Sequence, residues 1–271
     1  MSTINTNMSS LNAQRNLTKS SNELQTSMSR LSSGLRVNSA KDDAAGLSIA
    51  TKMDSQVRGM SQASRNANDG ISMIQTADGA LSNIGDALQR IRELAVQGAN
   101  GTNGTDEFDN IKTEITALNE EITRIAEQTK FNGNAVLTSG GTTKDIQVGA
   151  DSGQTITVTF GDADAFSNLT VTDITDEATA STVIDEMDAA LKALNTERSS
   201  LGTAQNRMGY AISNLSTSIE NQTAAKSRIM DTDYAAETSK LSRSQILQQA
   251  GTAMLAQANS APNSVMSLLR G

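Results

Sequence analysis

Residues 43–98 read DAAGLSIATKMDSQVRGMSQASRNANDGISMIQTADGALSNIGDALQRIRELAVQG and contain no proline. Apolar or small side chains recur in this stretch at intervals of seven: Met53, Met60, Ala67, Ile74, Leu81, Leu88 and Ala95. Four further apolar residues widen the stripe: Val57, Ile71, Ile84 and Ile91. This spacing is typical of a helix that packs lengthwise against other helices. With a rise of about 1.5 Å per residue, such a helix would be roughly 80 Å long and would need partners along its whole length.

Two shorter segments flank this stretch and have their own helical periodicity. Leucines at positions 17, 24 and 31 repeat at seven and predict a helix over residues 5–34, with Gly34 as its end. Ser39 followed by Asp42 is expected to cap the long helix. Beyond a glycine-rich turn, the segment that opens at Thr105 continues the 3/4 spacing with Phe108, Ile111, Ile115, Leu118, Ile122 and Ile125. The second segment is therefore expected to fold back on the long helix as a helical hairpin.

The second half of the chain predicts two more helices. One begins near Asp176 and has a single apolar stripe: Ile184, Met187, Leu191, Leu194, Leu201, Met208, Ile212, Leu215 and Ile219. A break at 230–233 separates it from a last helix over 234–269, in which Pro262 is expected to introduce a kink or end the main body.

A short β region is predicted between these helical halves. Ile146 and Val148 alternate with polar residues, and so do Ile156, Val158 and Phe160 after a glycine-containing turn. Leu169 and Val171 are candidates for one further strand. The expected fold class is mainly α: an elongated antiparallel helical bundle or coiled coil, with paired N- and C-terminal helices and a small β-hairpin region in the middle.

Composition argues against catalysis and against a redox role. The chain has no Cys and no His, which removes the usual zinc ligands and the commonest general base. We therefore expect no enzyme, no cofactor and no metal site, and we interpret the carboxylates at 42, 43, 231 and 233 as capping and connector groups. The formal net charge is −8, and residues 101–190 carry 17 Asp and Glu against 4 Lys and Arg. Such an acidic segment is expected to face outward into solvent, with no nucleic acid as partner.

The N-terminal residues have no basic run followed by an apolar core, so no Sec-type signal peptide is expected. No window approaches 18 apolar residues, so no membrane insertion is expected. The terminal stripes are narrow, and their apolar edges find cover only if copies associate. A head-to-tail contact that does not close on itself produces a helical filament, which favours a self-assembling structural protein.

Sequence blocks in both halves of the chain resemble bacterial flagellin, and the resemblance spans nearly everything except about residues 138–180. The blocks are RLSSGLRVNSAKDDAAGLSIA (30–50), QRIRELAVQ (89–97), EITALNEEITRI (114–125), QTKFNG (128–133), AQNRMGYAISNL (204–215), SRIMDTDYAAETSKLSRSQILQQAG (227–251) and SVMSLLRG (264–271). The short middle is similar to a minimal flagellin without large outer domains.

The resemblance implies a domain plan and a function. Residues 1–42 and 231–271 would form an inner core domain, and residues 43–230 a rod domain whose β region lies at about 140–172. The chain would polymerise with itself, outside the cell, into the flagellar filament that drives swimming. It would be exported without a Sec signal by the flagellar type III system, with a chaperone, the export gate, the cap and hook-associated proteins as partners.

Two sets of site residues follow, the first from the apolar residues of the terminal segments and the second from the resemblance to flagellin. Subunit packing is assigned to apolar residues of the terminal helices: Leu17, Leu24, Met28, Leu31, Leu35, Leu241, Leu247, Met254, Leu255, Val265, Met266, Leu268 and Leu269. Recognition by a vertebrate toll-like receptor, as a secondary property, is assigned to Gln89, Arg90, Glu93, Leu94, Gln97 and Glu114. Within the bacterium the same face is expected to meet a neighbouring subunit, and Leu94 could instead pack against the helical hairpin.

Two other structural roles share some of these features. A hook–filament junction protein would have similar terminal stripes, but it is not expected to combine the blocks at 89–97 and 264–271. A signalling coiled coil would have the heptads, but it would lack the β region.

Overall fold

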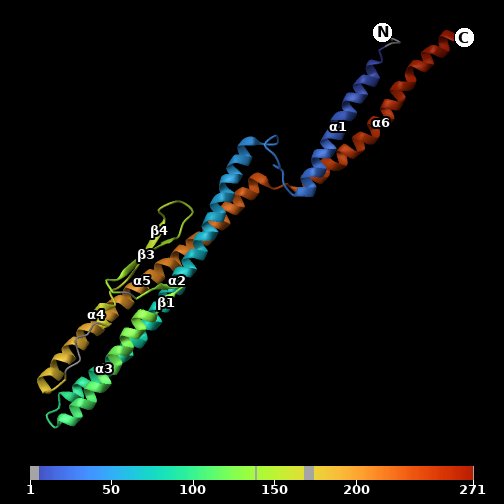
Figure 1. The fold of residues 1–271 in the computed structure, drawn as a ribbon. Coiled ribbons are helices and arrows are strands. Elements are labelled where there is room, and N and C mark those ends of the chain that lie inside the picture. Colours follow the sequence, from blue (N-terminus) through green and yellow to red (C-terminus); the bar gives the residue numbers. More distant parts are fainter. Residues whose placement is uncertain (1–5, 138, 168–173, 271) are drawn as a thin grey trace. The chain divides into compact units, whose positions relative to one another are not determined.

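The computed structural model describes residues 6–137, 139–167 and 174–270, with side-chain surroundings as far as Ser260. The chain divides into two compact units. We call residues 1–55 with 221–271 the terminal unit, and residues 56–220 the central unit. Figure 1 labels the helices of both units and the strands β1, β3 and β4.

The terminal unit pairs the two ends of the chain. Helix α1 (Met8–Ser33) and helix α6 (Tyr234–Arg270) lie side by side along their lengths (Figure 1). The Asn7 side chain accepts a hydrogen bond from the Ser10 amide at 3.1 Å, and Gly34 ends α1 in the left-handed conformation with φ 73°. Glycine adopts this conformation without the steric cost of a Cβ atom, as the sequence predicts for this position.

Pro262 was expected to kink or end the last helix; the helix continues to Arg270, so the predicted end at Pro262 is wrong. Proline has no N–H to donate to the carbonyl four residues earlier, which here is Ala258. The Asn7 side-chain amide on α1 donates to that carbonyl oxygen at 2.7 Å. The helix can therefore continue to Arg270, because a group from the neighbouring helix replaces the lost hydrogen bond.

The two connectors of the terminal unit pair with each other. Leu35 and Asp231 form an antiparallel bridge, and the Thr232 amide donates to the Gly34 carbonyl at 2.9 Å. Asp43 caps the start of α2 (Ala44–Gly98) by accepting from the Gly46 amide at 2.8 Å. The Asp42 side chain instead accepts hydrogen bonds from the amide and the hydroxyl of Ser39. The expectation that Ser39 and Asp42 cap α2 is therefore wrong.

In the central unit, α2 packs antiparallel to α5 (Glu177–Met230). Asp78 pairs with Arg198, and further along α2 Arg92 pairs with Asp188, earlier on α5. The α2 heptad is confirmed as the core, since six of its members are buried: Met60, Ala67, Ile74, Leu81, Leu88 and Ala95. On α5 the predicted stripe is likewise buried at Met187, Leu194, Leu201, Met208 and Leu215.

Helix α3 (Thr105–Gln128) folds back on α2, as predicted. The Glu107 side chain accepts from the Gly104 amide at 3.0 Å and helps to start the helix. Ile111, Ile115 and Ile122 are buried in the same core as the α2 stripe.

The β region comprises two antiparallel hairpins. Strand β3 (Thr142–Gln147) pairs with β4 (Thr155–Phe160), with Ile146 opposite Ile156, and the predicted alternation buries Ile156, Val158 and Phe160. The predicted strand at Leu169 and Val171 lies outside the described residues. A short helix, α4 (Asp164–Ser167), follows β4.

A second hairpin, formed by β1 (Lys130–Phe131) and β2 (Asn134–Ala135), was not predicted from the sequence. Asn132 and Gly133, with φ of 48° and 79°, form its two-residue turn. An Asn-Gly pair between two short extended segments is a strong hairpin signal. The fold class itself is confirmed: mainly helical, with paired terminal helices and small antiparallel strand pairs in the middle.

Candidate self-assembly surface

The buried face between α1 and α6 consists of small and polar residues. Ser20, Ser27 and Ser244 are each 4–5% exposed, whereas no large apolar side chain of either helix is buried among the described residues. A Cβ atom at Gly251 would lie 3.3 Å from Leu17 Cδ1, so the glycine permits close approach of the two helices. This seam brings the helices together without covering their apolar side chains.

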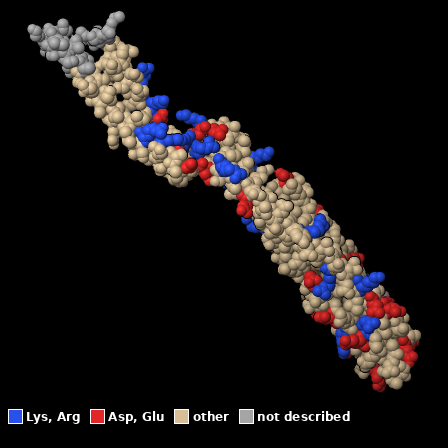
Figure 2. Space-filling view, turned by 180° about the vertical axis from the view of Figure 1, so that it is seen from behind, with Lys and Arg blue, Asp and Glu red and all other residues tan. Residues whose placement is uncertain are grey.

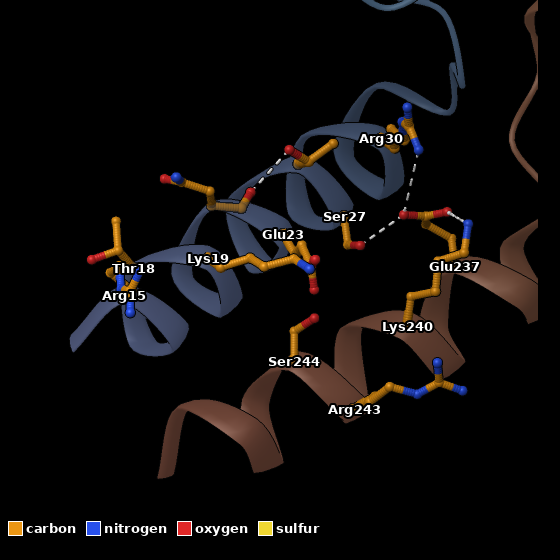
Figure 3. A pocket seen from close by; sticks show the side chains of 12 residues that line it. Arg15, Thr18, Lys19, Glu23, Ser27, Arg30, Glu237, Lys240, Arg243 and Ser244 are labelled. Atoms are coloured by element: carbon orange, nitrogen blue, oxygen red, sulfur yellow. Dashed lines mark hydrogen bonds and ion pairs between the residues drawn. The ribbon is translucent and has the colours of Figure 1, made fainter. Parts of the chain in front are cut away.

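One carboxylate is buried in the seam. Glu237 has a side chain only 6% exposed; it accepts from the Ser27 hydroxyl at 2.7 Å and pairs with Lys240 at 3.1 Å and with Arg30 at 4.0 Å (Figure 3). Burial raises the pKa of Glu237. The hydrogen bonds from Ser27 and Lys240 and the charges of Lys240 and Arg30 outweigh burial, so the pKa lies below its ordinary value.

The predicted packing residues lie beside this seam rather than inside it. Of the nine whose side chains are described, six are half-buried: Leu17, Leu24, Leu31, Leu35, Leu241 and Leu255. Met28, Leu247 and Met254 are 57%, 48% and 64% exposed. The side chains of Val265, Met266, Leu268 and Leu269 lie outside the described residues.

Four more large hydrophobic side chains of the same pair are exposed and were not predicted; one is Tyr234, which is 56% exposed. Met8, Leu11 and Ile246 are 64%, 46% and 65% exposed. They lie outside the leucine heptads, so a search for sevenfold repeats does not select them. The sequence feature that could have identified them is an apolar residue directly beside the narrow heptad stripe.

A groove of about 580 Å³ runs between α1 and α6 beside these residues. Leu17, Leu247, Met254 and Gly251 contribute its apolar lining. The terminal pair therefore presents both exposed apolar side chains and a concave surface that could receive a neighbouring helix. Apolar side chains grouped along a groove, as Leu17, Leu247 and Met254 are here, favour an interaction site.

The second predicted set lies on the central unit and forms a charged surface cluster. Arg90 donates through Nε and Nη2 to Glu114 at 3.0 and 2.8 Å, and through Nη1 to Glu93 at 3.2 Å. These side chains are 45–69% exposed, and the hydrogen bonds from Arg90 to Glu114 and Glu93 raise the pKa of Arg90. Gln89 and Gln97 are also exposed. The structure thus brings Arg90, Glu93 and Glu114 together on one surface.

Leu94 does not belong to that surface. It is 3% exposed and is part of the hydrophobic core, with residues of α2, α3 and α5. Of the two roles considered for Leu94, its position fits packing within the helical hairpin.

Charge and metal chemistry offer no other site in the described part of the chain. Figure 2 shows Asp and Glu gathered over the end of the central unit formed by α3 and the start of α5. Among the described residues, no group of three or more His, Cys, Asp or Glu could hold a metal ion. None of the described helices is long and apolar enough to cross a membrane.

These features define a class: a helical structural protein with exposed apolar surface on its paired ends. The family models agree with this class. The model for the bacterial flagellin N-terminal helical region matches residues 4–142, and the model for the C-terminal helical region matches residues 184–269.

Individual relatives support the same assignment. The chain is 47% identical over 270 residues to flagellin of Halalkalibacterium halodurans, covering 98% of this chain and 99% of the relative. It is 45% identical over a 311-residue alignment to flagellin of Xenorhabdus nematophila, covering 99% of both. A crystal structure of Bacillus cereus flagellin matches with a TM-score of 0.52 and 37% identity, covering 56% of this chain and 88% of that one.

The chain belongs to the bacterial flagellin family. It is a structural protein of the flagellar filament and not an enzyme. Filaments of this family form by self-polymerisation and lie outside the cell.

Proposed function

We propose that this flagellin polymerises by burying the exposed apolar side chains of α1 and α6 against neighbouring copies. One observation carries the proposal: the seam between these helices is made of small and polar residues and leaves large apolar side chains in solvent. Water contact with such surface is unfavourable by about 25 cal/mol per Å², so association that covers it is favoured. A contact repeated from copy to copy without closure extends into a filament.

Seeded polymerisation tests this proposal. The double variant Leu247→Ser and Met254→Ser removes two apolar side chains from the groove without touching the buried seam. We expect a large loss of sedimentable filament, with helix content retained by circular dichroism. Val96→Ser, which removes a 50% exposed apolar side chain from the central unit, is the matched control. Normal filament growth by the double variant would contradict the proposal.

The extreme C-terminus is proposed to take part in the same packing. Val265, Met266, Leu268 and Leu269 fall at the end of α6, within the block SVMSLLRG that resembles flagellin. Deletion of residues 260–271 is expected to leave a soluble monomer that cannot extend seeds. Filaments of ordinary length from the deleted chain would show that these residues are dispensable.

The domain plan follows from this role. Residues 1–42 and 231–271 would form the inner core of the filament, and residues 43–230 the rod around it. The pairing of α1 with α6 supports placing both chain ends in one domain. Electron microscopy of filaments at a resolution that separates helices would test the assignment.

Export partners belong to the same proposal. The chain would leave the cell through the flagellar type III exporter without a Sec signal, and a chaperone would cover α6 before export. The exposed Ile246, Leu247 and Met254 support this, since α6 would otherwise present apolar surface in the cell. The export gate, the cap and hook-associated proteins would then act on the released subunit. Loss of the chain from culture fluid in an exporter-deficient strain, with Sec secretion intact, is the expected result.

Recognition by a vertebrate toll-like receptor is proposed as a secondary property of the central unit. The exposed cluster of Arg90, Glu93 and Glu114, with Gln89 and Gln97, supports it. Arg90→Asp should abolish receptor stimulation by the monomer. Arg92→Asp is a matched control, because Arg92 lies two residues away and pairs with Asp188 instead. Equal loss in both variants would argue against a specific contact at Arg90.

A further inference from the structure

The seam between α1 and α6 repeats along its length almost without change. On α1 its positions are Ala13, Ser20, Ser27 and Gly34, and on α6 Ser244, Gly251 and Ala258, all at sevenfold spacing. Side chains this small fit against one another wherever they meet. A slip of one heptad, about 10.5 Å along the axis, would therefore leave the packing of small residues nearly as before.

Glu237 is the exception in this repeat. It occupies the α6 position seven residues before Ser244, and it faces Ser27 and Arg30 on α1. Arg30 Nη1 lies 4.0 Å from Glu237 Oε1, so the guanidinium places its positive charge beside the buried carboxylate. A buried carboxylate is tolerated only where hydrogen bonds and a positive charge offset the loss of water.

The α1 sequence reverses the charge one heptad earlier. Ser27 and Arg30 are three residues apart, and the equivalent pair seven residues earlier is Ser20 and Glu23. A slipped α6 would thus find a similar hydroxyl but a carboxylate where the guanidinium had been. A slip in the other direction would carry Glu237 to Gly34, beyond the end of α1 at Ser33.

We propose that Glu237 sets the register of the terminal helix pair, with Arg30 selecting the native register and Glu23 rejecting the slipped one. The register determines which apolar side chains of α1 and α6 stand next to each other, and hence the surface that one copy offers to the next. Only this consequence rests on the polymerisation proposed above; the register is a property of a single chain.

Other contacts also favour the native register, among them the hydrogen bond at 2.9 Å from the Thr232 amide, just before α6, to the Gly34 carbonyl at the end of α1. Asn7 donates to the backbone carbonyl of Ala258, which Pro262 leaves without a helical donor, so this hydrogen bond also fits the native register. The Ser10 hydroxyl bonds Asn259 at 2.7 Å at an exposed position, where water can replace either partner. These contacts support the native register, but they carry no charge that penalises another.

Disulfide reporters can read the register directly, because the chain has no cysteine of its own. The periodicity that joins Ser27 to Glu237 places Ser20 opposite Ser244, so Ser20→Cys with Ser244→Cys reports the native register. Ala13→Cys with Ser244→Cys reports the slipped one. A disulfide needs Cα atoms within about 7 Å, which distinguishes registers 10.5 Å apart. Intramolecular products, identified by monomer mass without reductant, are scored in both sedimented filaments and supernatant.

The decisive variant exchanges the two α1 charges, Glu23→Arg with Arg30→Glu, and leaves the net charge unchanged. We expect the ratio of native to slipped cross-link to fall at least about tenfold. In the native register Glu237 would then face a glutamate at position 30 and be repelled, whereas in the slipped register it would face an arginine at position 23 and be attracted. Arg30→Gln should give a smaller fall in the same direction.

Lys240→Gln is the matched control. Lys240 also contacts Glu237, but it lies on α6 and accompanies Glu237 in any register, so its removal should leave the ratio unchanged. An unchanged ratio of native to slipped cross-link after the charge exchange would overturn the proposal. An equal shift of that ratio in Lys240→Gln would also overturn it. So would the absence of the native cross-link in the chain that keeps Glu23 and Arg30. Filament formation is measured separately by sedimentation. A variant that does not polymerise can therefore be distinguished from one in which α1 and α6 adopt the slipped register.

Discussion

Gly59 on α2 packs against Ala150 in the loop of the β3–β4 hairpin: a Cβ atom at Gly59 would lie 3.0 Å from the Ala150 Cβ and 3.2 Å from its Cα. The second of these is a backbone atom, so a side chain at Gly59 would push the hairpin loop away from α2. Glycine in a helix interior costs about 1 kcal/mol relative to alanine. At this position the absence of a side chain allows the hairpin loop to lie close to α2, which offsets that cost.

Alanine substitutions at two α2 glycines should therefore have opposite effects on the free energy of unfolding. Gly79→Ala should stabilise the central unit by about 0.5–1 kcal/mol, because nothing lies within 4 Å of the added atom and helix propensity improves. Gly59→Ala should be about 1–3 kcal/mol less stable than Gly79→Ala because of the crowding at Ala150. Urea unfolding followed by circular dichroism measures both. Equal stabilisation by the two substitutions would show that the hairpin loop yields freely.

The central unit was predictable because its core is built from large apolar residues in long regular patterns. The α2 stripe at Ile74, Leu81 and Leu88 dominates its sequence and is buried as expected. The β1–β2 hairpin was less visible, since two-residue strands have no alternation to count and only the Asn132–Gly133 turn marks them.

Truncation in this core should be costly. Leu88 is fully buried and belongs to the cluster that joins α2, α3, α5 and the β region. Leu88→Ala should destabilise the central unit by about 2–5 kcal/mol, the range for a leucine truncation that leaves a cavity. Val96→Ala, at a half-exposed position on the same helix, should cost less than about 0.5 kcal/mol. The comparison uses midpoints of thermal or urea unfolding, and similar losses would mean that the helix does not pack as described.

The ion pair between Arg198 and Asp78 should contribute little to stability despite its good geometry. Arg198 Nε donates to Asp78 Oδ1 at 2.8 Å, and this hydrogen bond raises the pKa of Arg198. The side chains are 39% and 46% exposed, so water screens the attraction. A double-mutant cycle with Arg198→Ala and Asp78→Ala should give a coupling free energy of about 0.2–1 kcal/mol. A coupling above about 2 kcal/mol would contradict the assignment as a surface pair.

The terminal pair was only partly predictable, for a physical reason. Its apolar stripe was visible in the sequence at Leu17, Leu24 and Leu31, but the buried contact is formed by Ser20, Ser27 and Ser244. Small polar residues have no hydropathy signal, and their burial depends on how closely two helices approach. Leu94 shows the complementary limit: the resemblance to flagellin grouped it with exposed neighbours, whereas its position in the heptad stripe places it in the core.

The contribution of Glu237 to the terminal unit should depend on pH in a defined direction. Its pKa in the folded chain is below the ordinary value of 4.5, so the unfolded chain binds the proton more tightly than the folded one. The carboxylate therefore stabilises the helix pair fully above pH 4.5, and this stabilisation is lost as the pH falls through the lowered folded pKa. Acid should weaken the pairing of α1 and α6. In Glu237→Gln this pairing should already be weaker than in the native chain at neutral pH.

Hydrogen exchange of α6 backbone amides over residues 237–251 can measure this effect between pH 7 and pH 3, after correction for the intrinsic rate. The native chain should lose protection in the acid range, whereas Glu237→Gln should change less over the same range. Ser27→Ala removes a hydrogen bond that lowers the pKa, so the loss should begin at a higher pH in that variant. Identical profiles for the native chain and Glu237→Gln would mean that this carboxylate does not stabilise the pair, since its ionisation is the only difference between them over this range.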